Sequence, residues 1–328
     1  MNFTSLEYFI AVAREGSMTR AAEMLHISQQ AMSSHIRKLE EEAGVKLFER
    51  TAPLSLTYAG KQFLKGARSL LTNHRQLMQQ MVDIRNETRG TLLIGINHSR
   101  GAALLPLILP SFSRKNPDIE VKLIEGYSTS LEEAMLNDET DINIGYHPKF
   151  VEQIKSHIID VVEDRIVMLA SQRCMERLFG DRAESVRARM RAKPEISLFR
   201  DAPFVMLNRK MTIRKQVDEF LLKNGFVPKI VLETASLETQ LALAMEDFGI
   251  CFHSQTMLEG LNEAYQSDIR KNMDIFCIDD PSLQAHLCVY FRCDRYLSRS
   301  AWAFIDEMLL FYNNPTRVNW SELDALQN

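Results

Sequence analysis

The chain has 328 residues, enough for two or three domains that each bury their own core. No apolar run is long enough to cross a bilayer, so the sequence predicts no transmembrane helix and no membrane partner. The formal net charge is −4, but residues 1–90 carry 12 Lys and Arg against 9 Asp and Glu. The positive charge therefore lies in the N-terminal part, which is where contact with an anionic partner is expected.

The cysteines predict a reduced protein without a metal centre. Five are present, with no CxxC and no metal-ligand spacing: Cys174, Cys251, Cys277, Cys288 and Cys293. An odd count without a signal peptide indicates free thiols and a cytoplasmic location. We expect no metal site, no bound cofactor and no catalytic residue; a redox-sensitive cysteine is the alternative.

Residues 20–39 predict two short helices joined by a tight turn at His26 and Ile27. Ser28 is placed to cap the second helix, because its hydroxyl can accept from a free backbone N–H group. Beyond it, apolar residues recur at helical spacing and form a buried stripe: Ala31, Met32, Ile36 and Leu39. This pattern favours a helix-turn-helix that enters a DNA groove, and an ordinary helical hairpin is the alternative.

The other face of the second helix is polar and, in its N-terminal half, lacks carboxylates. It carries short or forked hydrogen-bonding groups that suit base edges and phosphates: Gln29, Gln30, Ser33, Ser34 and Arg37. Residues 40–42 are three glutamates, which would face solvent and repel phosphate. The N-terminal half of the helix, where the helix dipole also favours phosphate, is therefore expected to meet DNA.

The flanking sequence extends this pattern. Residues 3–13 predict an amphipathic helix ended by Gly16, and Gly44 stops the polar-faced helix. Residues 45–60 predict two short strands around a turn at residues 52–53. This hairpin corresponds to the wing of a winged helix-turn-helix.

The segment SLEYFIAVAREGSMTRAAEMLHISQQAMSSHIRKLEEEAGVKLFER, followed by LSLTYAG, resembles the N-terminal domain of LysR-type transcriptional regulators. The chain has Gln30 where the family commonly has Pro, and Ser34 where it often has Arg. Its wing is one residue short and lacks the arginine that many members place in the minor groove. The resemblance implies double-stranded DNA as a partner, without specifying an operator, and these contact residues: Ser28, Gln29, Gln30, Ser33, Ser34, Arg37, Lys38 and Arg50.

A long linker helix is predicted from about Tyr58 to Thr88, capped by Thr57 and ended by Gly90. Its apolar residues alternate in steps of four and three, as in a coiled-coil seam, with His74 as the polar member: Phe63, Ala67, Leu70, His74, Leu77, Met81 and Ile84. This favours a homodimer that presents two recognition helices to two half-sites. The alternatives are a helix that packs on its own domain and a His74 that faces solvent.

From residue 91 strands alternate with helices. Strands are predicted at 91–96, 119–126 and 141–147, with helices at 101–117 and 130–139. After a strand at 161–171, a second series follows: strands 202–207, 229–234 and 249–253, with helices 212–226 and 237–248. A strand at 285–292 and a helix at 300–312 would return to the first series. This order predicts parallel sheets with helices on both faces.

Two α/β lobes joined by two crossing strands resemble the periplasmic-binding-protein-like effector domain of the same family. The overall fold class is therefore α/β, with an N-terminal winged helix-turn-helix, a long linker helix and a two-lobed effector domain. The predicted boundaries are 1–57, 58–90 and 91–328. Lobe one spans about 91–163 and 270–312, and lobe two spans about 164–269.

Ligands of such sheets bind beyond the carboxyl ends of the strands, near helix N-termini. Candidate effector-binding residues occupy those positions: Asn97, His98, Ser99, Arg100, Tyr127, Ser128, Thr129, Tyr146, Asn208, Thr234, Ser236 and His253, with Leu237 and Ser254 beside them. The guanidinium of Arg100 suits a carboxylate, while His98 and Tyr146 suit an aromatic or hydroxylated effector. The alternative for each residue is a helix cap.

Residues 174–201 look longer than the family norm and are rich in arginine. We expect a solvated helix there; a second basic surface is the alternative.

The leading interpretation is a DNA-binding transcription regulator that responds to a small-molecule effector, with a homotetramer implied by the family resemblance. A solute-binding or transport protein is the second hypothesis, and the missing signal peptide argues against it. An enzyme is the third, but GxGxxG, P-loop, GxSxG and HExxH motifs are all absent from the sequence.

Overall fold

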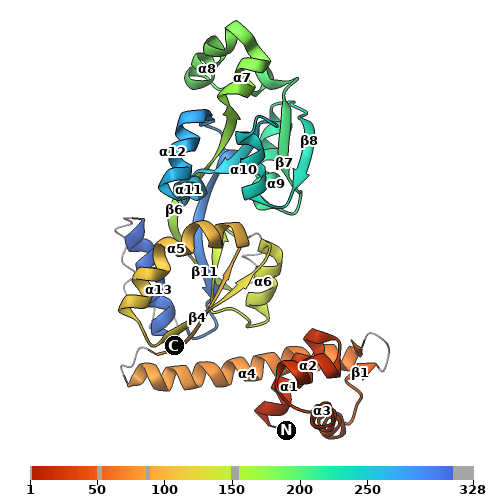
Figure 1. The fold of residues 1–328 in the computed structure, drawn as a ribbon. Helices are drawn as coiled ribbons and strands as arrows, with labels where there is room; N and C mark the ends of the chain where they lie inside the picture. The colour runs from red at the N-terminus through yellow and green to blue at the C-terminus, as the bar shows by residue number, and fades with distance from the viewer. Residues whose placement is uncertain (1, 50–53, 86–88, 149–154, 313–328) are drawn as a thin grey trace. The chain divides into compact units, whose positions relative to one another are not determined.

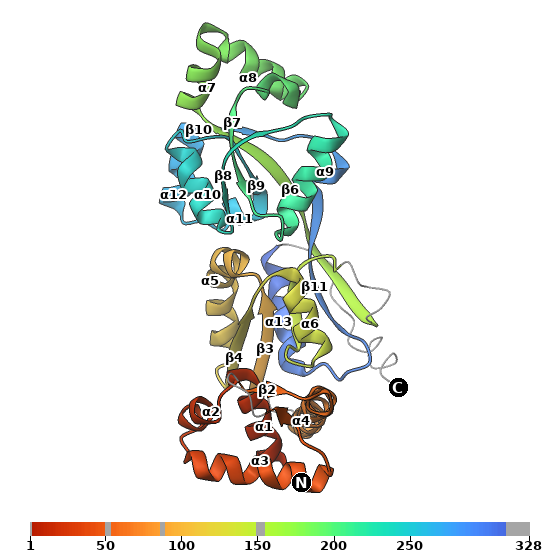
Figure 2. The ribbon, with the colours of Figure 1, turned by 90° about the vertical axis from the view of Figure 1, so that its right-hand side faces the viewer.

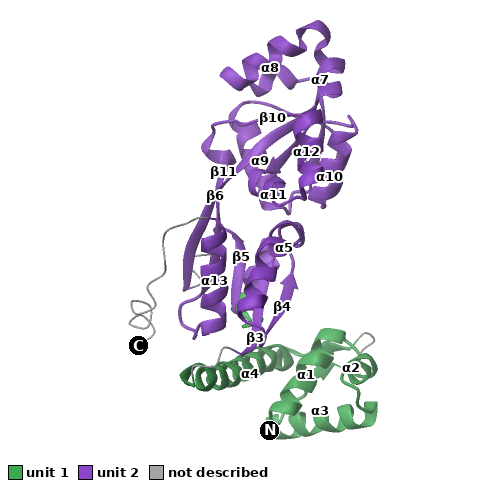
Figure 3. Cartoon of the chain, turned by 60° about the vertical axis from the view of Figure 1, so that its left-hand side comes forward, with its two compact units in different colours: residues 1–88, 134–139 green, residues 89–133, 140–328 purple. Residues whose placement is uncertain are grey.

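The computed structural model describes residues 2–49, 54–85, 89–148 and 155–312. The chain divides into two compact units, residues 1–88 with 134–139 and residues 89–133 with 140–328 (Figure 3). The first division falls after residue 88, two residues before the predicted boundary of the linker segment at residue 90. The unit that begins at residue 89 holds most of the predicted effector domain.

The N-terminal domain contains the predicted helices and hairpin: α1 (Phe3–Glu15), α2 (Met18–Met24), α3 (Gln29–Ala43), β1 (Phe48–Glu49) and β2 (Ser55–Leu56). Gly16 and Gly44 end α1 and α3 in the left-handed region, with φ of 58° and 70°, where glycine is least strained. Ser28 caps α3 by accepting a hydrogen bond from the Ala31 N–H at 3.1 Å. The predicted turn at residues 52–53 lies outside the described residues.

An apolar core holds these helices together: Leu6, Phe9, Val12, Ala21, Ala22, Met32, Ile36, Leu39, Leu47 and Phe48. The stripe expected on α3 is confirmed at Met32, Ile36 and Leu39, whereas Ala31 is only partly buried. Because this stripe fixes the inner face of α3, the opposite face stays exposed to solvent.

The predicted coiled-coil seam lies on the linker helix α4 (Tyr58–Ile84) and has two parts, one packed in the N-terminal domain and one exposed. Phe63 and Ala67 pack into the core of the N-terminal domain, as the alternative interpretation expects. His74 stacks on Phe3 of α1, with ring centroids 4.3 Å apart. The remaining apolar members are exposed in the single chain: Leu70, Leu77, Met81 and Ile84. The part of the seam that can receive a second helix therefore begins at residue 70.

The second unit contains a seven-stranded sheet with strand order β10-β6-β11-β5-β3-β4, in which β9 also pairs with β6, and a separate two-stranded parallel sheet of β7 and β8. The first lobe contains β3 (Gly90–Ile96), α5 (His98–Lys115), β4 (Ile119–Glu125), α6 (Ser128–Leu136), β5 (Ile142–Tyr146), β11 (Gln284–Arg292) and α13 (Arg299–Phe311). Strands β3, β4 and β5 run parallel, as predicted, and β11 is antiparallel to β5. Figure 1 shows α5 and α13 on one face of these strands and α6 on the other.

The long strand β6 (Ser156–Ser171) belongs to both lobes: its first part pairs with β11, and its last part pairs with β9 and β10. The second lobe contains α7 (Gln172–Phe179), α8 (Ala183–Ala192), β7 (Pro203–Leu207), α9 (Thr212–Lys223), β8 (Lys229–Thr234), α10 (Leu237–Met245), β9 (Cys251–Ser254), α11 (Gln255–Glu259), α12 (Glu263–Asn272) and β10 (Met273–Phe276). Short 3-10 turns occupy Gly180–Arg182, Ile196–Phe199 and Pro281–Leu283. Figure 2 shows β6 and β11 running between the lobes.

The structure corrects three expectations in the second lobe. The boundary at residue 270 is too early, because β10 pairs with β6 from Met168 to Ser171 and Phe276 lies in the core of this lobe. The strands are not all parallel, since β9 and β10 both run antiparallel to β6. Arg187 of α8 departs from the expected solvated helix, because its side chain is 12% exposed and its Nε lies 2.7 Å from Asp274, whereas Arg189 and Arg191 are exposed as expected. None of the helices in the described residues combines the length and apolarity needed to cross a bilayer.

Candidate functional site

The exposed face of α3 carries seven of the eight residues predicted to contact DNA: Ser28, Gln29, Gln30, Ser33, Ser34, Arg37 and Lys38. The Arg37 Nε lies 3.2 Å from the Glu41 carboxylate one helical turn away, so its charge is partly compensated. The eighth residue, Arg50, lies outside the described residues. The face offers hydrogen-bonding groups at the N-terminal end of the helix, and its base contacts stay a prediction.

Glu40 corrects the expectation that all three glutamates of α3 face solvent. Its Oε1 accepts from the backbone N–H groups of Leu47 at 2.9 Å and Phe48 at 3.3 Å, and its Oε2 lies 2.7 Å from the Lys46 Nζ. Burial acts to raise the pKa of Glu40, but the hydrogen bonds and the Lys46 charge outweigh it and lower the pKa. Glu40 therefore ties the start of the wing to the recognition helix.

A cleft between the two lobes of the second unit encloses a cavity of about 50 Å³. Five of the predicted effector-binding residues line it: Asn97, Arg100, Tyr127, Ser128 and Tyr146. Leu237, which was named beside them, also lines it. The sequence interpretation missed further lining residues: Leu131, Ile144, Gly145, Lys210, Met211, Thr212, Ile213, Met257 and Tyr290. Lys210 and Met211 precede α9, and Thr212 and Ile213 begin it, so the expected helix at 212–226 could have pointed to these residues.

The other predicted effector residues lie outside this lining: His98, Ser99, Thr129, Asn208, Thr234, Ser236 and His253. Ser236 caps α10 and accepts from the Thr239 N–H at 3.0 Å, as the helix-cap alternative expects. The exposed His98 pairs with Glu125 at 3.1 Å. His253 is buried, and burial lowers the pKa of its imidazole, which favours the neutral form.

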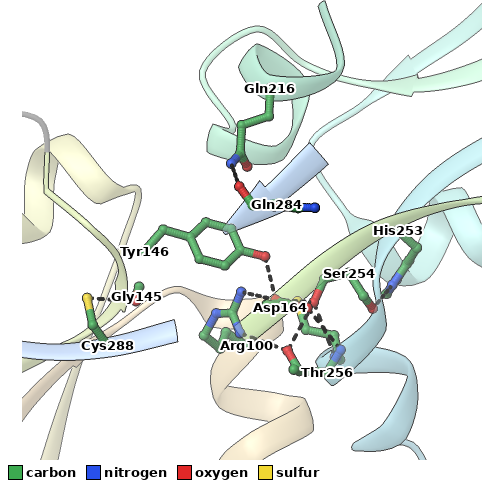
Figure 4. A network of polar contacts seen from close by, with 11 residues as sticks. Arg100, Gly145, Tyr146, Asp164, Gln216, His253, Ser254, Thr256, Gln284 and Cys288 are labelled. Atoms are coloured by element: carbon green, nitrogen blue, oxygen red, sulfur yellow. Dashed lines mark hydrogen bonds and ion pairs between the residues drawn. The ribbon is translucent and has the colours of Figure 1, made fainter. Parts of the chain in front are cut away.

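Behind the cavity, Asp164 of β6 forms the centre of a buried polar network that the sequence interpretation missed (Figure 4). Its Oδ2 accepts from the Tyr146 hydroxyl at 2.6 Å and the Ser254 hydroxyl at 2.7 Å, and its Oδ1 accepts from the Thr256 N–H at 3.1 Å. The Arg100 Nη2 lies 3.4 Å from the same carboxylate, and its guanidinium lies 4.6 Å from the centre of the Tyr146 ring. These groups come from both lobes.

Charge in this network is balanced. Burial acts to raise the pKa of Asp164, but the Arg100 guanidinium and the hydrogen bonds outweigh it and hold the pKa below its usual range. Asp164 therefore stays ionised and neutralises the buried Arg100. The sequence could have indicated that Asp164 is buried, because Asp164, Ile166 and Met168 are spaced two apart on β6 and therefore share its inward face.

The mouth of the cavity is formed by two helix N-termini that contact each other. The Ser128 hydroxyl at the start of α6 lies 3.0 Å from the Thr212 hydroxyl at the start of α9. Within the described residues, no side chain caps the first turn of α9, whose N-cap position is Met211. By contrast, side chains cap the nearby helices α5, α10 and α11: Asn97, Ser236 and Ser254 respectively. The N–H groups of α9 are thus open to an anion.

Comparison with known proteins places both halves of the chain. Residues 3–61 match the family model of the bacterial regulatory helix-turn-helix protein, lysR family, and residues 85–310 match the LysR substrate binding domain. The uncharacterized HTH-type transcriptional regulator YcgK of Bacillus subtilis (strain 168) is 28% identical over 317 residues, covering 93% of each chain.

Solved structures share the fold. A full-length OxyR variant from Pseudomonas aeruginosa has a TM-score of 0.71 and 20% identity, covering 97% of this chain and 99% of that one. Full-length CbnR complexed with its target DNA has a TM-score of 0.62 and 21% identity, covering 95% and 100%. The chain therefore belongs to the LysR family, whose members are DNA-binding, effector-responsive transcription regulators and not enzymes.

Proposed function

We propose that this regulator responds to a small carboxylate that binds in the cavity between the lobes and is held by Lys210 and the N-terminus of α9. The observation that carries the proposal is the uncapped first turn of α9, which lines the cavity. Unsatisfied N–H groups at the positive end of a helix favour an anion. Lys210 lies at the same mouth and is exposed.

The charge balance favours Lys210 over Arg100 as the main cation for the effector. Arg100 lines the cavity, but its charge is already matched by Asp164 at 3.4 Å. A carboxylate at Arg100 would have to compete with that buried partner, whereas Lys210 makes none of the ion pairs found among the described residues. Arg100 would then serve mainly to hold Tyr146 and Asp164 in place.

The rest of the lining suits a compact apolar or aromatic body on the carboxylate. Tyr127, Tyr146 and Tyr290 supply ring faces and edges, and Met257 supplies an adaptable apolar side chain. The volume of about 50 Å³ favours a small effector. Since Ser128 and Thr212 join the two lobes at the mouth, an effector seated there would bias their closure. We place the regulator in the cytoplasm, together with the DNA that it binds.

A thermal-shift screen tests the effector class with matched pairs of small carboxylates and their amides. The proposal expects a carboxylate, but not its amide, to raise the Tm of the full chain, and the Lys210→Ala variant to lose that response. Lys215→Ala removes an exposed lysine of α9 that does not line the cavity and serves as the matched control. Equal responses to acid and amide, or an unchanged response in Lys210→Ala, would contradict the proposal.

A further inference from the structure

Three potential metal ligands meet on the sheet of the first lobe, and none of them lines the inter-lobe cavity. His147 directly follows β5, Asp160 lies on β6 and Cys288 lies on β11. Their ligand atoms all lie within 4.8 Å of one another, and the His147 Nε2 lies 2.5 Å from the Asp160 Oδ1. Cys288 is far from His147 and Asp160 in the sequence, so spacing alone could not reveal the cluster.

The strand register explains why these side chains meet. Strand β11 lies between β5 and β6, and Cys288 is opposite Gly145 on one side and Asp160 on the other. The register between β11 and β6 shifts at Leu287/Cys288, which marks a bulge. The cluster is therefore set by backbone pairing rather than by mobile loops.

A second histidine lies close to this cluster. His286 lies two residues before Cys288, so both side chains project from the same face of β11. The His286 and His147 ring centroids are 5.9 Å apart. A rotation of the His286 side chain can therefore bring a ring nitrogen towards the other three donors.

We propose that His147, Asp160 and Cys288, with His286 as the fourth donor, bind a divalent transition-metal ion of the Zn²⁺ type. Imidazole, thiolate and carboxylate are the donors that Zn²⁺ takes in fourfold sites, whereas Ca²⁺ and Mg²⁺ take oxygen donors. Bond lengths of about 2.0–2.3 Å place tetrahedral ligands roughly 3.3–3.7 Å apart, so small side-chain rotations would complete the site. On binding, Cys288 releases its proton to solvent and becomes the thiolate ligand.

Access to the site is open from solvent. The side chains of His147 and Asp160 are 50% and 53% exposed, while Cys288 is buried beneath them. An ion can therefore enter past the exposed pair and reach the sulfur.

The site also adjoins the inter-lobe cavity. The Cys288 thiol donates to the Gly145 carbonyl oxygen at 3.3 Å, and Gly145 lines the cavity (Figure 4). The next residue, Tyr146, donates to Asp164. A metal ion would therefore fix the cavity wall beside Tyr146.

The test uses the full chain after treatment with a chelator, with Zn²⁺ titrated by calorimetry and Co²⁺ as a spectroscopic probe. The proposal expects one ion per chain and a sulfur-to-cobalt charge-transfer band. His147→Gln and Cys288→Ser should each weaken Zn²⁺ binding more than about 100-fold, since loss of an outer-shell partner alone costs 10–100-fold. The band should disappear in Cys288→Ser and be lost or shifted in His147→Gln.

Two matched controls separate this site from others. His157→Gln changes another histidine of the same sheet, and Cys293→Ser changes the next cysteine along the chain; both should keep the wild-type affinity and the band. Zn²⁺ binding without the cobalt band, or binding that survives His147→Gln unchanged, would overturn the proposal. Because His147 is exposed, its variant keeps the test decisive even if Cys288→Ser does not fold.

Discussion

The recognition face of α3 and the Asp164 network both consist of polar side chains, yet their environments are opposite. The α3 residues from Gln29 to Ser34 on the polar face are exposed. Asp164 is completely buried, and both of its oxygens accept hydrogen bonds. Exposed polar groups can exchange water for DNA at little cost to folding, whereas a buried charge must be matched inside the chain. The comparison predicts that substitutions on α3 change binding and that substitutions at Asp164 change stability.

The largest effect is expected for Asp164→Asn. This change leaves the buried Arg100 without its counter-charge, and loss of one partner of a buried pair costs about 3–5 kcal/mol of unfolding free energy. Trp302 is buried in the core of the first lobe, so its fluorescence during denaturant unfolding follows the effector domain.

Two further variants sharpen this prediction. Glu163→Gln changes the exposed neighbouring carboxylate on β6, which pairs with Arg165 at 3.0 Å, and should cost less than about 1 kcal/mol. The double variant Arg100→Met/Asp164→Asn removes both charges and should recover part of the lost stability. A single variant as stable as wild type would show that the network is not needed for folding.

The next effect concerns DNA binding by α3. Gln29→Ala and Ser33→Ala should each weaken binding to a specific promoter site by about 1–3 kcal/mol, the typical value of a good base contact. The unfolding free energy should not change, because both side chains are exposed. Promoter footprinting measures the affinity, and Gln62→Ala on α4 is a matched glutamine control. Unchanged footprints would show that these residues do not read the operator.

The smallest effect is expected for Glu40→Gln. The Glu40 side chain is less exposed than the recognition face of α3 and more exposed than Asp164. Glutamine keeps one acceptor oxygen but loses the charge, so the wing should be less stable by about 1.5 kcal/mol. Because the pKa of Glu40 is lowered in the folded protein, its stabilisation is present above the ordinary glutamate pKa and is lost as the pH falls through the lowered value.

Amide hydrogen exchange at Leu47 and Phe48 measures this effect directly, since their N–H groups donate to Glu40. Exchange in the variant should be faster near neutral pH and should depend less on pH in the acidic range. Glu41→Gln changes the exposed neighbour and should leave both amides protected. Equal protection in wild type and Glu40→Gln would show that the wing does not depend on this carboxylate.

Features fixed by local chemistry were predicted from the sequence. Gly16, Gly44 and Ser28 act through the backbone of their own turn, so their positions alone located the helix ends. The parallel strands β3, β4 and β5 followed from their apolar runs and the helices between them. The exposed face of α3 followed from its helical period.

Features that depend on distant partners were not predicted. Asp164 is matched by Arg100 and Thr256, which lie 64 and 92 residues away. Glu40 turns inwards only because the wing presents backbone N–H groups to it. Strand β10 was not predicted, and the lobe boundary was placed too early, because only its antiparallel pairing with β6 assigns it to the second lobe. In each case the deciding partner acts through tertiary contact rather than sequence spacing.

The place of β11 in the sheet has a consequence for how the chain is made. Strand β11 lies between β5 and β6, although it follows the whole second lobe in the sequence. A ribosome therefore releases residues 90–283 before the first lobe can acquire its central strand. The N-terminal domain can fold before the rest of the chain is synthesised, because its core uses only residues from the start of the chain. We expect it to be folded while the effector domain is still incomplete, and thus able to meet DNA before the chain can respond to its effector.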